Sequence, residues 1–198
     1  MGCIRLGNTI KKRGPYLKGI LIGGSTFVLA ILASFISQLI LDSVTSLILA
    51  FLLLVFIILT GIIFDIIGVA ATVASHQAFH ARAAKRIPGA RQALRIAKNS
   101  STVASFANDV VGDTSGTLSG AIGAVIVLRL IMGQVSSIQV YAGTIMTAFV
   151  AALTVGGKAM GKSFAINNAE EIIFQVGRLL YVWERIFKVE VLANGRRR

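Results

Sequence analysis

Four long apolar stretches alternate with polar, positively charged segments along this chain of 198 residues. The most apolar stretch is 46–75, SLILAFLLLVFIILTGIIFDIIGVAATVAS, in which Asp65 is the one ionisable residue. About 20 apolar residues cross a bilayer as a helix, so this stretch is long enough to span it. The same pattern predicts further spans at about 18–41, 115–132 and 138–155. The sequence therefore predicts an all-α integral membrane protein with four transmembrane helices.

The segments between and after the spans predict amphipathic helices at the membrane surface. Residues 76–100 mix six Lys and Arg residues with apolar ones, and Pro88-Gly89 divides them into two short helices. We expect their basic side chains to meet acidic lipid headgroups. Another amphipathic helix should follow the glycine-rich stretch 156–163, which we expect to be a flexible exit from the fourth span. Residues 101–114 are of intermediate polarity and predict a half-helix that re-enters the protein interior.

The distribution of charge predicts how the chain is inserted. The sequence has 20 Lys and Arg against 8 Asp and Glu, a net charge of +12. Short cytoplasmic loops collect Lys and Arg. With four spans, residues 1–18, 76–114 and 156–198 share one side and hold five, six and eight of the basic residues. We therefore expect both termini in the cytoplasm and a location in the plasma membrane. The positive charge is explained without nucleic acid as a partner.

Asp65 is the first candidate for function. A carboxylate at membrane depth is costly, so it normally faces a protein interior or a wet cavity. Gly61, Gly68 and Thr72 lie on the same helical face as Asp65. The helix thus presents a small, polar stripe to partner helices. Two interpretations stay open: Asp65 belongs to a functional site, or it only fixes helix packing.

Further oxygen ligands precede the third span. Asp109 and Asp113 are four residues apart and share a face if this segment is helical, and Asn108 stands beside them. Together with Asp65 they predict a cluster of oxygen ligands, which hard cations such as magnesium prefer. The alternative is that both acids cap the start of the third span, where the helix dipole favours negative charge.

Two other motifs carry weaker signals. GGKAMGKS at 156–163 fits the phosphate-loop pattern G-x-x-x-x-G-K-[ST], but a phosphate loop needs a parallel sheet to present it. His76 and His80 have the spacing of a zinc pair but lack the metalloprotease glutamate and a third ligand. No nucleophile–base pair stands out, so we expect neither an enzyme nor a bound cofactor.

Small residues at four-residue spacing form ridges along the third and fourth spans. Such ridges let helix backbones approach closely. They predict a homodimer. The ridges are Gly112, Gly116 and Gly120 in one span, and Gly143, Thr147 and Ala151 in the other.

Several of these features occur together in a known family. A span that ends near Ser75 is followed by a basic helix pair and an Asn108-containing segment. A later span ends in a stretch from Gly156-Gly157 to Gly161-Lys162, and Asn168-Ala169-Glu170 then opens an amphipathic helix. This order resembles the transmembrane domain of the cyclin-M/CorC magnesium exporters over residues 46–188. Residues 1–45 are then a basic N-terminus with an added transmembrane helix, and 189–198 a basic tail.

The resemblance implies an all-helical homodimer that binds a dehydrated magnesium ion between its helices and exchanges it for sodium. The chain departs from the family where the ion binds. Ile67-Gly68-Val69-Ala70 replaces a Ser-Gly-Ser-Glu-like run, and Gly157 replaces an acid. The family's nucleotide-sensing cytoplasmic domains do not follow within this sequence. A rearranged site would then use the acids of this chain.

We therefore expect a transporter or exporter of a divalent cation, with magnesium favoured as the transported ion. The interior site would use Asp65, Asn108 and Asp109, with Asp113 and Ser75 in support. The alternative is a non-transporting membrane adaptor or regulatory protein built on a transporter-like scaffold. Its basic cytoplasmic surface would bind acidic lipids or a partner protein.

Overall fold

The computed structural model describes residues 15–43, 46–131 and 136–187. These ranges are almost entirely helical and contain no strand, which confirms the predicted fold class. Four helical stretches are long and apolar enough to cross a membrane: Gly19–Leu39, Leu47–Val73, Ser100–Leu130 and Val140–Asn167. The predicted four spans are thus confirmed. Most of the predicted basic N-terminus and the whole of the tail 189–198 lie outside the described residues.

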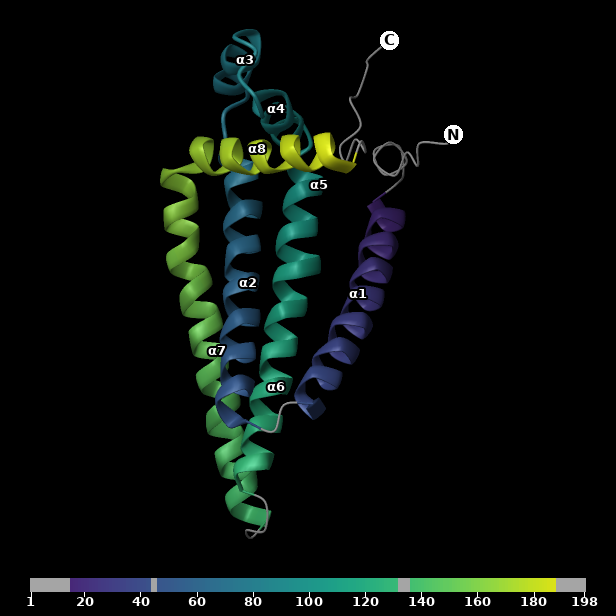
Figure 1. Cartoon of the computed structure of the whole chain (residues 1–198), viewed down its shortest axis with the longest axis vertical. Helices are drawn as coiled ribbons and strands as arrows, with labels where there is room; N and C mark the ends of the chain where they lie inside the picture. The colour runs from purple at the N-terminus through teal and green to yellow at the C-terminus, as the bar shows by residue number, and fades with distance from the viewer. Residues whose placement is uncertain (1–14, 44–45, 132–135, 188–198) are drawn as a thin grey trace.

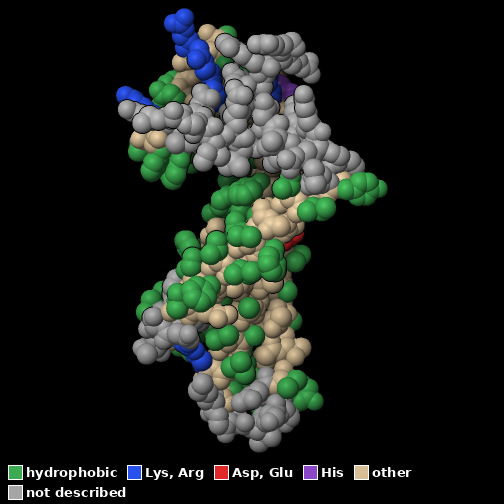
Figure 2. Space-filling view, turned by 90° about the vertical axis from the view of Figure 1, so that its right-hand side faces the viewer, with side chains coloured by type: hydrophobic (Ala, Val, Ile, Leu, Met, Phe, Trp, Pro, Cys, Tyr) green, Lys and Arg blue, Asp and Glu red, His purple; other side chains and the backbone are tan. Residues whose placement is uncertain are grey.

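Three of the spans form the centre of the bundle. They are α2 (Leu47–Val73), α7 (Ser136–Asn167) and a continuous helix composed of α5 (Ser100–Ala104), η1 (Ser105–Asp113) and α6 (Thr114–Leu130). The first span, α1 (Pro15–Ser43), packs against η1 and α6 and is otherwise largely exposed (Figure 1). On the face of the bundle drawn in Figure 2, uncharged side chains cover most of the surface, as a membrane-spanning surface requires.

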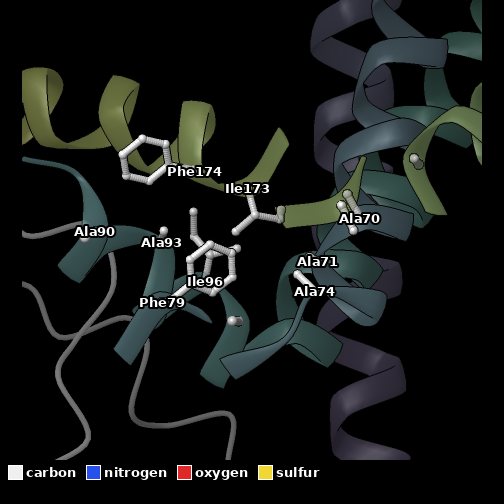
Figure 3. Close-up of a cluster of buried hydrophobic side chains, with 12 residues drawn as sticks. Ala70, Ala71, Ala74, Phe79, Ala90, Ala93, Ile96, Ile173 and Phe174 are labelled. Atoms are coloured by element: carbon white, nitrogen blue, oxygen red, sulfur yellow. The ribbon is translucent and has the colours of Figure 1, made fainter. Parts of the chain in front are cut away.

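Three shorter helices cover one end of the bundle, and we call them the cap. The helix α8 (Ala169–Phe187) crosses the ends of the central spans, and α3 (His76–Ala84) and α4 (Ala90–Lys98) lie beyond it (Figure 1). The predicted pair of short helices divided at Pro88-Gly89 is confirmed. Their apolar faces pack on α8 and on the end of α2, around Phe79, Ile96 and Ile173 (Figure 3). The pair is therefore held by the rest of the chain through its apolar side.

A glycine contact fixes the crossing of α8 over α4. A Cβ at Gly177 would lie 2.7 Å from the backbone nitrogen of Ala93 and 2.7 Å from the carbonyl oxygen of Gly89. Backbone atoms cannot move aside, so only glycine permits this approach. Gly89 itself has a φ of +86°, a left-handed conformation that glycine adopts without strain. The crossing brings the buried faces of the two helices together.

The predicted re-entrant half-helix at 101–114 is wrong. These residues begin the third span, which starts at Ser100 instead of Ser115. The backbone stays in the right-handed helical region at both junctions, with φ/ψ of −59°/−40° at Ser105 and −60°/−44° at Thr114. Residues 105–113 form a π-helix, so the helix continues with a wider turn where its polarity is highest.

The predicted flexible exit at 156–163 is also wrong, because α7 continues through it as a helix to Asn167. Its glycines serve packing. A Cβ at Gly161 would lie 2.8 Å from Cγ1 of Ile66, and a Cβ at Gly157 would overlap Ile62. The two glycines thus form a notch that receives two side chains of α2. The phosphate-loop interpretation fails, since the segment before the motif is a helix and the motif itself is part of that helix.

Part of the glycine ridge of the third span packs against α7 of the same chain. A Cβ at Gly112 would lie 3.5 Å from Nζ of Lys158, and one at Gly116 would lie 3.8 Å from Thr154. This part of the ridge faces α7 of the same chain, which leaves less of it for a homodimer. The second ridge, from Gly143 to Ala151, lines a groove between α6 and α7. The predicted homodimer therefore depends mainly on this groove and stays a prediction.

Candidate cation site

The polar residues Asp65 of α2 and Asn108 of η1 lie where these two helices meet. A Cβ at Gly68 would lie 2.6 Å from Cγ of Asn108 and closer still to its Oδ1. A Cβ at Gly61 would lie 2.9 Å from Cβ of Ser115. Asp65 stands between the two glycines on the same face of α2, so its side chain points toward η1. We call this contact the α2–η1 seam. It contains Gly61, Asp65 and Gly68 of the small, polar stripe that the sequence predicts, whereas Thr72, which the prediction included, is exposed.

Two buried oxygen atoms at this seam, one on each helix, lack hydrogen-bond partners within the described ranges. Asp65 is only 5% exposed, and its Oδ2 has no hydrogen-bond partner within the described ranges. The same holds for Oδ1 of Asn108 and for Oγ1 of Thr114 at the start of α6. A buried polar atom without a partner costs free energy and calls for an explanation, such as an ion that it binds.

The seam lies well inside the bundle. Asp65 is eight residues before the end of α2, and Asn108 is eight residues after the start of α5. With a rise of about 1.5 Å per residue, both lie about 12 Å from the cap end of their spans. The two side chains are therefore at matching depth on antiparallel helices. At this depth a carboxylate must find its partners within the protein.

A lysine that the sequence analysis left out reaches the same region from α7. Nζ of Lys158 donates hydrogen bonds to the carbonyl oxygen of Gly112, at 3.2 Å, and to Oδ1 of Asp113, at 3.3 Å. The Lys158 side chain is 17% exposed, and that of Asp113 is 72% exposed. The notch of glycines in α7 brings this part of the helix close to α2. A helical pattern extended through those glycines would have marked Lys158 as a charge within a span.

The structure separates the other predicted site residues from the seam. Asp109 is exposed, and Ser75 is an exposed residue just before α3, ten positions beyond Asp65. Asn108 and Gly112 both face α2, and each is followed by an acid. Successive helical residues point in directions roughly a quarter turn or more apart, and Asp109 and Asp113 are both exposed, so neither carboxylate is buried in the seam. The predicted cluster of three acids is thus not assembled.

No group of three His, Cys, Asp or Glu side chains in the described part of the chain is placed to hold a metal. His76 lies with Nε2 at 2.8 Å from the carbonyl oxygen of Ala97, which attaches α3 to α4. A cation at the seam would be bound by mixed oxygen ligands: the carboxylate of Asp65 and the amide of Asn108. Magnesium and other hard cations accept such ligands and keep several waters.

Comparisons with protein families, curated proteins and solved structures find no match for this chain. The likeness to the cyclin-M/CorC exporters thus rests on the order of sequence motifs alone.

Proposed function

We propose that this membrane protein transports a divalent cation, with magnesium favoured, through the α2–η1 seam. The supporting observation is Asp65, which is 5% exposed within a membrane span and whose Oδ2 lacks a partner among the described residues. Ionisable residues at membrane depth that face the protein interior commonly belong to ion pathways. We place the cap and both termini on the cytoplasmic side, following the distribution of basic residues.

The side chains of the seam have separate tasks in this proposal. Asp65 supplies negative charge that offsets the lost hydration of the ion. Asn108 adds a neutral oxygen, and Gly68 leaves room for its amide against α2. The π-helix supplies a local irregularity of the kind often found at functional sites. Movement of α2 against η1 would expose the site to each side of the membrane in turn.

Magnesium flux into proteoliposomes, read with an entrapped dye, tests the proposal. Wild-type protein should carry flux, and Asp65→Asn should abolish it because the amide carries no charge. Glu170→Gln is the control, since it removes an exposed acid of α8 far along the chain from the seam. Each variant must also be folded and inserted, as shown by its melting temperature and by protease protection.

Asp109→Asn tests whether Asp109, which the sequence predicts as a ligand and the structure leaves exposed, takes part in transport. Flux that survives Asp65→Asn but is lost in Asp109→Asn would contradict a site at the seam. An absence of flux in folded, inserted wild-type protein would contradict transport itself.

A second function has support in the cap. Lys85, Arg86, Arg91 and Lys98 are exposed on it, whereas Arg82 and Arg95 pair with glutamates of α8. An adaptor would use the exposed set to bind acidic lipids, which attract juxtamembrane basic residues. Acidic lipids that remain bound in mild detergent can be counted by mass spectrometry. Their number should fall when Arg91 and Lys98 are both changed to alanine, and an unchanged number would count against the adaptor.

A further inference from the structure

We propose that Lys158 is a tethered cation of the seam, and that a transported ion has to displace its ammonium group. The inference rests on the proposed function and adds a residue that controls affinity and release. Neither the motifs of the sequence nor the family resemblance points to this lysine.

The geometry places the ammonium group and the carboxylate on the same stretch of η1. Nζ of Lys158 is 3.2 Å from the carbonyl oxygen of Gly112. That carbonyl oxygen would lie 3.6 Å from a Cβ at Gly61 of α2. Asp65 is one helical turn along α2 from Gly61, on the same face. The positive group of α7 and the negative group of α2 therefore approach the end of η1 from two sides.

Gly112 lies directly beside the ammonium group. A Cβ there would lie 3.5 Å from Nζ of Lys158 and 3.3 Å from the carbonyl oxygen of Ala107, so it would be in contact with both. The ammonium group thus occupies space that a side chain larger than that of alanine would need. In a membrane span, a lysine needs acceptors from the protein, and here it has a backbone carbonyl and a carboxylate.

The charge on Lys158 opposes a divalent ion at the seam. Two positive charges that approach the same end of η1 repel each other in a region with a low effective dielectric constant. Binding would therefore drive the ammonium group away from Gly112. Asp113 offers a place for it, because its carboxylate is 3.3 Å away and its side chain is 72% exposed. The long, flexible stem of lysine permits such a movement.

This arrangement keeps binding weak enough for release. A transported ion must bind well enough to enter and weakly enough to leave. When the ion departs, the ammonium group returns to the carbonyl oxygen of Gly112 and replaces part of the lost positive charge. Lys158 would thus lower affinity and raise the rate of release.

Isothermal titration of purified protein with magnesium tests this role. Lys158→Met keeps most of the length of the side chain without its charge, and Lys158→Gln keeps an uncharged donor on a shorter side chain. Both should bind magnesium at least about tenfold more tightly, since each removes a positive charge beside the ion. Lys162→Met is the matched control: it removes the same charge from an exposed position one turn further along α7. Its affinity should equal that of the wild type.

The outcomes separate the two proposals. Unchanged or weaker binding in both Lys158 variants, with wild-type binding that Asp65→Asn abolishes, would overturn the role of Lys158 and leave the proposed function standing. Binding that appears only when Lys158 is replaced, and that Asp65→Asn removes again, would support the role. No binding in any folded variant would overturn both.

Discussion

Gly68→Ala is a direct test of the seam, because it adds one methyl group at its narrowest point. The new Cβ would lie 2.6 Å from Cγ of Asn108 and 3.1 Å from its Nδ2, whereas ordinary contacts begin at 3.4 Å. The whole amide would have to move, and with it the oxygen that we assign to the ion. We expect lower stability and loss of the stabilisation by magnesium.

The magnitude follows from two opposing terms. Replacing glycine by alanine inside a helix gains about 1 kcal/mol. Overpacking a well-packed contact costs about 1–3 kcal/mol. Gly120→Ala provides the matched control, because a Cβ there meets nothing within 4 Å while the gain in helix propensity is the same. The difference in free energy of unfolding between the two variants is then the overpacking cost alone, about 1–3 kcal/mol.

The assay is unfolding in mild detergent, with and without magnesium. Gly68→Ala should be less stable than Gly120→Ala, and magnesium should raise the melting temperature of the control and of the wild type only. Equal stability of the two variants would refute the close contact between Gly68 and Asn108. A normal magnesium response in Gly68→Ala would refute the assignment of Asn108 as a ligand.

Two further predictions concern the cap. Trp183, the one tryptophan of the chain, is 54% exposed and packs against Phe187 at 4.4 Å between ring centroids. In liposomes we expect blue-shifted emission and quenching by lipids brominated near the headgroup, whereas emission typical of water would contradict an interfacial α8. Glu184→Ala removes the carboxylate that accepts from Gln92 at 2.8 Å and pairs with Arg95 at 3.4 Å. Because the pair is only partly buried, the loss of stability should stay below the about 3–5 kcal/mol of a broken buried pair. Amide exchange in α4 should become faster, and unchanged exchange would count against this contact.

The hydrophobic pattern was sufficient to predict the number of spans and the place of Asp65, although not the start of the third span or the end of the fourth. Periodicity also placed Gly61 and Gly68 on the face of Asp65, and the structure packs both against the third span. Such features depend on residues close together in the chain and on the cost of polar groups in a membrane. Asn108, a predicted ligand, does lie at this seam.

The missed features depend on contacts between distant residues. Glycine is typical of loops, so nothing local shows that Gly157 and Gly161 pack against α2 within a helix. Once α7 is a helix, Lys158 belongs to the interior and not to a loop. In the same way, Asp109 could not be excluded from the site before it was known to be exposed while Asn108 faces Gly68, because the sequence does not fix which face of this helix meets α2.

The π-helix also allows the third span to lose a residue without disturbing its packing. Each of its turns holds more residues than an α-turn, so one residue can be deleted within 105–113 by returning that turn to α geometry. The faces of α6 beyond it would keep their orientation toward α2 and α7. A deletion between Gly61 and Gly68 cannot be absorbed in this way, because α2 is a regular α-helix there and one glycine would rotate by about 100° relative to the other. Within this bundle, η1 is therefore the segment in which evolution can change the length of a span without turning its packed faces away from their partners.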